Sequence, residues 1–271
     1  MSVSEPPSGV VVRRLRFAAH SVTAGRVLRT FKHPRLCLAV DEPAALSDSP
    51  TNSTDELLIA FVPPRATAEW EAVGGGWLAT SPDAPAVDLT WRGGRVRWQP
   101  GRAVVDLTGA ARDDVLAALA EFAFLEGELR RLEAEMDARE APAADDVTRS
   151  QTIDRRDRAH WPRFRAAIEA FARMRLTFAR LAPRFSEAAS GPGPPSHRLA
   201  SRLLRHARAE ARADALDARL EACEDLYEGA NDRVADAKGW HDGFIMELII
   251  VLLLLLEVVL LCVDLVLRGG E

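Results

Sequence analysis

Three acidic residues lie in or beside the most apolar stretch of the chain, and their spacing suggests a chemical role. Glu247, Glu257 and Asp264 accompany residues 248–263, which read LIIVLLLLLEVVLLCV. On a helix with 3.6 residues per turn, the three acids fall within one arc of about 100°. A carboxylate in such a stretch should face protein or water rather than lipid. The arc predicts a helix–helix contact face in an oligomer or a polar pathway. The alternative is an apolar helix that tolerates one protonated glutamate.

The histidines and cysteines predict no metal centre. His33 and Cys37 are four residues apart without a second pair nearby, and His197 and His206 are nine apart, on opposite sides of a helix. The three cysteines form neither a disulfide framework nor a zinc pattern. The glycine run at residues 74–76 lacks the Lys-Ser/Thr of a phosphate-binding loop. We therefore expect no catalytic residues, no cofactor, no metal and no enzymatic activity.

The apolar stretch predicts one C-terminal transmembrane helix over residues 243–267. These 25 residues would cross a hydrocarbon core of roughly 30 Å at 1.5 Å per residue. The fourteen Leu, Ile and Val residues between Leu248 and Val263 favour insertion by roughly 4–8 kcal/mol, against about 3 kcal/mol for a charged Glu257. Because only residues 269–271 follow Arg268, we expect the body in the cytoplasm at a bacterial inner membrane. The alternative is the matrix side of a mitochondrial inner membrane.

The composition of the sequence bears on one class of partner, nucleic acid. The sequence is 48% hydrophobic and 28% charged, with a net charge of −5, which argues against a nucleic-acid partner. Residues 1–35 are rich in arginine and contain one acid, Glu5, as in a mitochondrial presequence. The apolar and basic pattern of residues 10–17 favours a strand instead.

The first part of the chain predicts a small α+β domain over residues 10–108, after a disordered lead at residues 1–9. Residues 24–31 are expected to form a short helix. Glycine-containing turns join the last three strand candidates, because glycine permits the positive φ of tight hairpins. The strand candidates are residues 10–18, 35–40, 56–62, 86–91, 95–99 and 102–107.

After the α+β domain, the apolar residues recur at the three- and four-residue steps of a helix. Residues 111–185 predict a helical pair, with the first helix over 113–139 and a polar connection over 140–157. Pro183 should end or bend the second helix. That helix carries an aromatic stripe, which predicts core packing: Phe164, Phe171, Phe178 and Phe185.

A third helix predicts a coiled-coil stalk over residues 197–241. Its apolar positions alternate in steps of four and three. They are Ala209, Ala213, Leu216, Leu220, Cys223, Tyr227, Ala230, Val234 and Ala237. The same phase continues through Leu248, Val251, Leu255 and Val258. We therefore expect a homo-oligomer that forms through residues 197–262.

The order of parts and residues 246–259 (MELIIVLLLLLEVV) resemble the family named for a requirement in meiotic nuclear division. That family includes sporulation-linked yeast proteins, mitochondrial members and bacterial relatives. Glu257-Val258 corresponds to the Glu-Val of the family's ending, and Glu247 to its leading acid. The family's tryptophan after that acid is Leu248 here.

A second stretch, residues 118–129, also resembles the family, with Leu125-Glu126 and Glu128 in the matching places. The resemblance implies a membrane-anchored, oligomeric protein that is not an enzyme, and mitochondrial members support organellar translation.

Together these features predict an α+β protein with a small sheet-rich N-terminal domain, long helices with coiled-coil character and one C-terminal transmembrane helix. We expect a C-terminally anchored, self-associating membrane scaffold or tether that holds an unknown protein partner. Two alternatives remain open. One is an oligomeric membrane pathway lined by the intramembrane acids. The other is a soluble protein with the apolar helix buried in its core.

Overall fold

The computed structural model describes residues 9–19, 25–51, 54–63, 70–71, 73–78, 86–106, 112–151, 161–190 and 193–268. The chain divides into two compact units. Unit 1 comprises Met1–Arg139 and Arg173–Leu220, and unit 2 comprises Glu140–Ala172 and Glu221–Glu271. The predicted lead lies outside the described residues except for Gly9.

Unit 1 contains a seven-stranded sheet with the order β2-β3-β1-β4-β7-β6-β5. All neighbouring strands are antiparallel except β4 and β7, which are parallel and join the two antiparallel halves. The strands are β1 (Val11–Ala18), β2 (Arg26–Phe31), β3 (Cys37–Ala44), β4 (Glu56–Val62), β5 (Val87–Trp91), β6 (Gly94–Gln99) and β7 (Arg102–Asp106). The strand candidates of the sequence are thus confirmed, with shifted ends.

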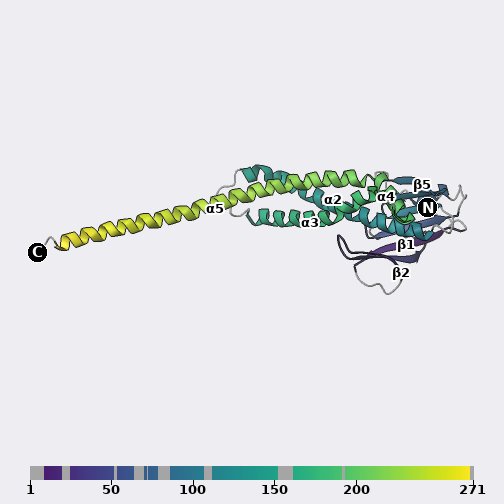
Figure 1. Cartoon of the computed structure of the whole chain (residues 1–271), viewed down its shortest axis with the longest axis horizontal. Helices are drawn as coiled ribbons and strands as arrows, with labels where there is room; N and C mark the ends of the chain where they lie inside the picture. Colours follow the sequence, from purple (N-terminus) through teal and green to yellow (C-terminus); the bar gives the residue numbers. More distant parts are fainter. Residues whose placement is uncertain are drawn as a thin grey trace. The chain divides into compact units, whose positions relative to one another are not determined.

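The sheet is covered on both faces. Helix α2 (Arg112–Gln151) lies along one face of the sheet (Figure 1). There the Phe31 ring of β2 stacks on Phe124 of α2 at 4.0 Å, and Trp98 of β6 meets Phe122 edge-on at 4.8 Å. On the other face, Val12 and Val104 lie in a core cluster with Trp70, which also includes the short helix η1 (Val73–Trp77). Because β4 lies at the centre of this sheet, its run Leu57–Val62 is buried and uniformly apolar.

Long helices follow the sheet in the sequence. After α2 come α3 (Trp161–Ser190), α4 (Pro195–His206) and α5 (Ala209–Arg268). The aromatic stripe of α3 is confirmed as core, since its four phenylalanines are between 2% and 6% exposed.

Several local predictions are wrong. Residues 24–31 form strand β2 rather than a helix, because pairing with β3 from Arg26 to Phe31 overrides the local helical preference. Helix α2 continues through the predicted polar connection to Gln151 with Pro142 inside it, and α3 continues past Pro183. A helix begins near residue 197, as predicted, since α4 starts at Pro195. It does not continue unbroken into the predicted stalk, because Arg208, with φ 53°, separates α4 from α5.

The predicted transmembrane helix over residues 243–267 is also wrong. Among the residues that the structure describes, no helix has both the length and the apolarity that a membrane crossing requires. Glu247 and Glu257 interrupt the apolar run of α5. The prediction of a single-pass, C-terminally anchored membrane protein is therefore wrong as well.

Candidate functional site

The most unusual surface of the described residues is the apolar segment of α5, defined here as residues 245–260. All sixteen residues are exposed. Its fourteen large apolar side chains are between 42% and 68% exposed. A side chain on an isolated helix keeps roughly this exposed fraction, because only the neighbouring turns of its own helix contact it. No other described part of the chain therefore covers the segment. The alternative of an apolar helix buried in the protein's own core is therefore not observed.

The exposed area is large enough for a protein interface. Fourteen half-exposed side chains of this size present roughly 1,000 Å² of apolar surface, whereas the largest patch on a typical monomer is about 300–600 Å². A standard interface buries about 800 Å² on each partner. The segment therefore has the size and composition of an unoccupied contact surface.

The earlier part of α5 differs, because its predicted coiled-coil seam is buried within each unit. In unit 1, Leu216 and Leu220 are 1% and 0% exposed. In unit 2, Tyr227 packs against the rings of Phe164 and Phe171 of α3 at 6.0 and 5.5 Å. Its hydroxyl donates to Asp146 Oδ2 of α2 at 3.0 Å. The seam up to Ala230 is thus occupied inside the chain, and the apolar segment is what remains free for a partner.

The structure places the three acids of the sequence prediction on α5, and it does not bring Glu247 or Glu257 against another described element. Glu247 and Glu257 are exposed within the apolar segment. Ten residues separate them, which is about 15 Å along a helix axis. Asp264 belongs to α5, but its side chain lies outside the described residues.

Three other glutamates, which the sequence did not single out as a site, are buried in unit 1 on α2. Glu121, Glu126 and Glu128 are 2%, 1% and 6% exposed. Two arginines pair with each of them, and at least one of the two comes from a distant element. Arg29 and Arg184 pair with Glu121, Arg212 and the same-helix Arg130 with Glu126, and Arg35 and the same-helix Arg131 with Glu128. Because each carboxylate is already paired, these acids hold the helices and sheet of unit 1 in register rather than await a ligand.

The acids of the described residues do not form a metal centre. No group of three or more His, Cys, Asp or Glu side chains in that part of the chain has the arrangement that could hold a metal ion.

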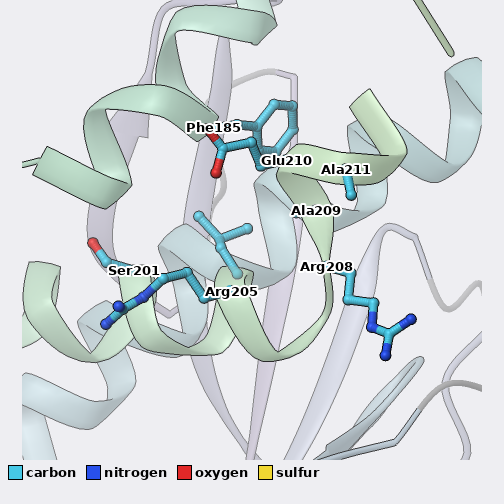
Figure 2. Close-up of a pocket in the computed structure, with 8 residues that line it drawn as sticks. Phe185, Ser201, Arg205, Arg208, Ala209, Glu210 and Ala211 are labelled. Atoms are coloured by element: carbon cyan, nitrogen blue, oxygen red, sulfur yellow. The ribbon is translucent and has the colours of Figure 1, made fainter. Parts of the chain in front are cut away.

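A cavity of about 200 Å³ lies at the junction of α4 and α5. Figure 2 shows the guanidinium groups of Arg205 and Arg208 pointing away from each other, so they do not converge on one ligand. Ser201 is already engaged, since its hydroxyl donates to the His197 carbonyl oxygen at 2.8 Å. The polar groups around this cavity are therefore not arranged to bind one ligand.

Comparisons with known proteins do not assign this chain to a family. No protein-family model matches the sequence, and no curated protein matches it. The resemblance to the meiotic nuclear division family therefore stays a prediction. Among solved structures, the chain is similar to the CorA magnesium transporter from Methanocaldococcus jannaschii, with 5% identity over 88% of this chain and 81% of that chain. The TM-score is 0.35, too low for this likeness to support an argument about fold or function.

Proposed function

We propose that this chain is a scaffold without catalytic activity that associates with copies of itself through the apolar segment of α5. One observation carries the proposal: sixteen consecutive exposed residues, fourteen of them large and apolar, stand on a helix whose preceding seam is already packed. Exposed apolar surface of this extent marks a site of interaction with another protein or with lipid. Burying it at roughly 25 cal/mol per Å² gives association a strong driving force, before the entropic costs of assembly.

Copies of the same chain fit this surface better than an unrelated partner. The segment is aliphatic around most of its circumference, so a single flat partner would leave half of it in water. Helices of identical length and composition cover one another on several sides, and closed symmetry buries the same patch in every copy. Leu248, Val251, Leu255 and Val258 alternate in steps of three and four residues. This spacing places their side chains where they can insert between the side chains of a neighbouring helix.

Sedimentation velocity of the full chain tests the proposal. We expect an oligomer at micromolar concentration. Replacing Leu252, Leu253 and Leu255 by Asn, at positions 59%, 60% and 60% exposed, should weaken association by at least about a hundredfold. The matched control replaces Leu36 and Leu176 by Asn, since these leucines are equally exposed, at 59% and 61%, but lie outside the segment.

The control variant should sediment like the unmodified chain. Monomeric unmodified chain at every concentration would overturn the proposal. So would equal weakening by the triple and control variants. A chain that stays monomeric while its apolar segment binds phosphatidylcholine vesicles would assign this surface to lipid instead of to other copies.

A further inference from the structure

The side of α5 that packs inside its own chain can be followed into the apolar segment. In unit 2 this buried side contains Cys223, Tyr227 and Ala230, which are 9%, 2% and 0% exposed. Helix α3 and Asp146 of α2 contact Tyr227 there. Helix α5 is continuous to Arg268 and contains no proline, so a rotation of about 100° per residue extends the buried side along it.

Five apolar side chains of the segment lie on the extension of this buried side. They form a stripe with steps of three and four residues: Ile245, Leu248, Leu252, Leu255 and Val259. They are between 42% and 60% exposed, and their mean direction lies within about 10° of the buried side. Val251 and Val258, at the heptad positions, turn away from it by about 20° per heptad. Glu247 and Glu257 lie at least about 120° from the stripe, so a contact along it leaves both acids in water.

Helices α2 and α3 limit how a second copy can approach this side of α5. They cover it up to Ala230, and the stripe starts at Ile245, about 22 Å further along the helix. In a parallel pair joined by the stripe, the α2 and α3 layers of both copies would lie between the two α5 helices. Since packed helices lie about 8–10 Å apart, the α5 axes would be about 25–30 Å apart beside Tyr227 and about 8–10 Å apart at the stripe. A continuous helix cannot follow both separations.

An antiparallel pair avoids this conflict. The stripe is nearly symmetric about Leu252, with Ile245 and Val259 seven residues to either side. With the two-fold axis at Leu252, residue 245 of one copy faces residue 259 of the other. Arg268, the last residue of α5, then lies level with Asp236, past the part of the buried side that α2 and α3 cover. Each α5 is therefore covered first by its own helices and then by the α5 of the other copy.

We infer that copies of this chain pair in antiparallel orientation through the stripe, with the two-fold axis at Leu252. This inference rests on the proposed self-association and names the side of α5 and the orientation that it uses. The packed parts of unit 2 of the two copies then project from opposite ends of the pair. Apolar side chains beside the stripe remain available for contacts with further pairs.

Disulfide crosslinking between cysteine variants of the full chain tests the orientation. All variants carry Cys262→Ser, so the other cysteines are Cys37 and Cys223, which are buried. Copper phenanthroline should couple Leu252→Cys to its own copy, and Ile245→Cys to a co-expressed Val259→Cys chain, because a disulfide needs α-carbons within about 7 Å. Ile245→Cys should couple to its own copy at least about tenfold less, since those residues would be about 21 Å apart. Peptide mass spectrometry identifies each crosslink.

Co-expressed Ile250→Cys and Leu254→Cys chains are the matched control. These residues are 54% and 57% exposed and lie level with each other in the same antiparallel pair. They are at least about 140° from the stripe around the helix, so they should couple at least about tenfold less than Ile245→Cys and Val259→Cys.

The outcomes separate the two proposals. Coupling of Ile245→Cys to its own copy without coupling to Val259→Cys would show a parallel contact and overturn the inference. Association without any coupling through the stripe would overturn it too, as would equal coupling of the control chains. These results leave the scaffold proposal standing. Unmodified chain that sediments as a monomer at every concentration would overturn the scaffold proposal itself.

Discussion

Arg212 in the first turn of α5 pairs with Glu126 of α2, 86 residues earlier in the chain. Its Nη1 donates to Glu126 Oε1 at 2.7 Å and its Nε donates to Glu133 Oε1 at 2.8 Å. Burial alone would lower the pKa of Arg212, but hydrogen bonds to Glu133 and the charge of Glu126 outweigh it and raise that pKa above its ordinary value. One guanidinium thus ties two helices of unit 1 through a carboxylate that is 1% exposed.

Replacing Arg212 with Met should destabilise unit 1. Glu126 would keep Arg130 as a partner but lose the second cation, so the loss should be about 2–4 kcal/mol in the free energy of unfolding. Arg219→Met is the matched control, since the Arg219–Asp137 pair is 33% and 66% exposed, and exposed pairs contribute about 0.2–1 kcal/mol. Urea unfolding followed by tryptophan fluorescence measures both. Equal losses in the two variants would contradict this account of Arg212.

Gly127→Ala should also destabilise the chain, although alanine favours a helix over glycine by about 1 kcal/mol. A Cβ at Gly127 would lie 2.9 Å from the Thr54 carbonyl oxygen, so α2 or the chain before β4 would have to shift. We expect a net loss of about 1–3 kcal/mol. Gly229→Ala on α5 meets nothing within 4 Å and should gain about 0.5–1 kcal/mol. Thermal unfolding should therefore move in opposite directions for the two variants.

The sequence predicted those parts of the fold that local pattern determines. The alternation and glycine turns of β5, β6 and β7 were visible without any tertiary information, as was the heptad stripe of α3 that ends at Phe185. Strand β2 was missed because its strand character comes from pairing with β3 rather than from its own residues. The break at Arg208 was missed because no glycine or proline marks it.

The candidate site was found only in part. Glu247 and Glu257 were identified from their apolar surroundings. However, Arg29, Arg212 and Arg35, which pair with Glu121, Glu126 and Glu128, come from elements far away in the chain. Sequence spacing contains no signal for pairs of that kind. Similarly, the four-and-three seam of α5 did not reveal whether its partner would be another copy or the same chain. The burial of Tyr227 against α3 answers this for the first half of the helix.

Cys37 should resist alkylation in the folded chain. It is 0% exposed, and burial raises the pKa of its thiol, which Arg35 opposes only in part. Because the thiolate is the reactive form, iodoacetamide at pH 8 should modify Cys37 at least about a hundredfold more slowly than in urea-unfolded protein. Peptide mass spectrometry resolves the site. Equal rates in folded and unfolded chains would show that Cys37 is accessible in solution.

Tyr227 allows a site-resolved pH prediction because it is the only tyrosine in the chain. Burial raises the pKa of its phenol above the ordinary value of 10.0, and the hydrogen bond to Asp146 and the charge of that acid raise it further. The absorbance of phenolate at 295 nm should therefore develop well above pH 10 in the folded chain and near pH 10 in urea.

This difference also fixes the direction of a stability change in unit 2. The folded state holds the phenolic proton more tightly than the unfolded state, so the contribution of Tyr227 is fully present below pH 10 and declines as the pH rises above it. Tyr227→Phe should unfold with a smaller loss of stability between pH 9 and pH 11 than the unmodified chain. At pH 7 the variant should lose the hydrogen bond to Asp146, at a cost of about 1–2 kcal/mol. A folded-state titration centred at pH 10 would show that the phenol is in water, and the packing of α3 against α5 in unit 2 would then need revision.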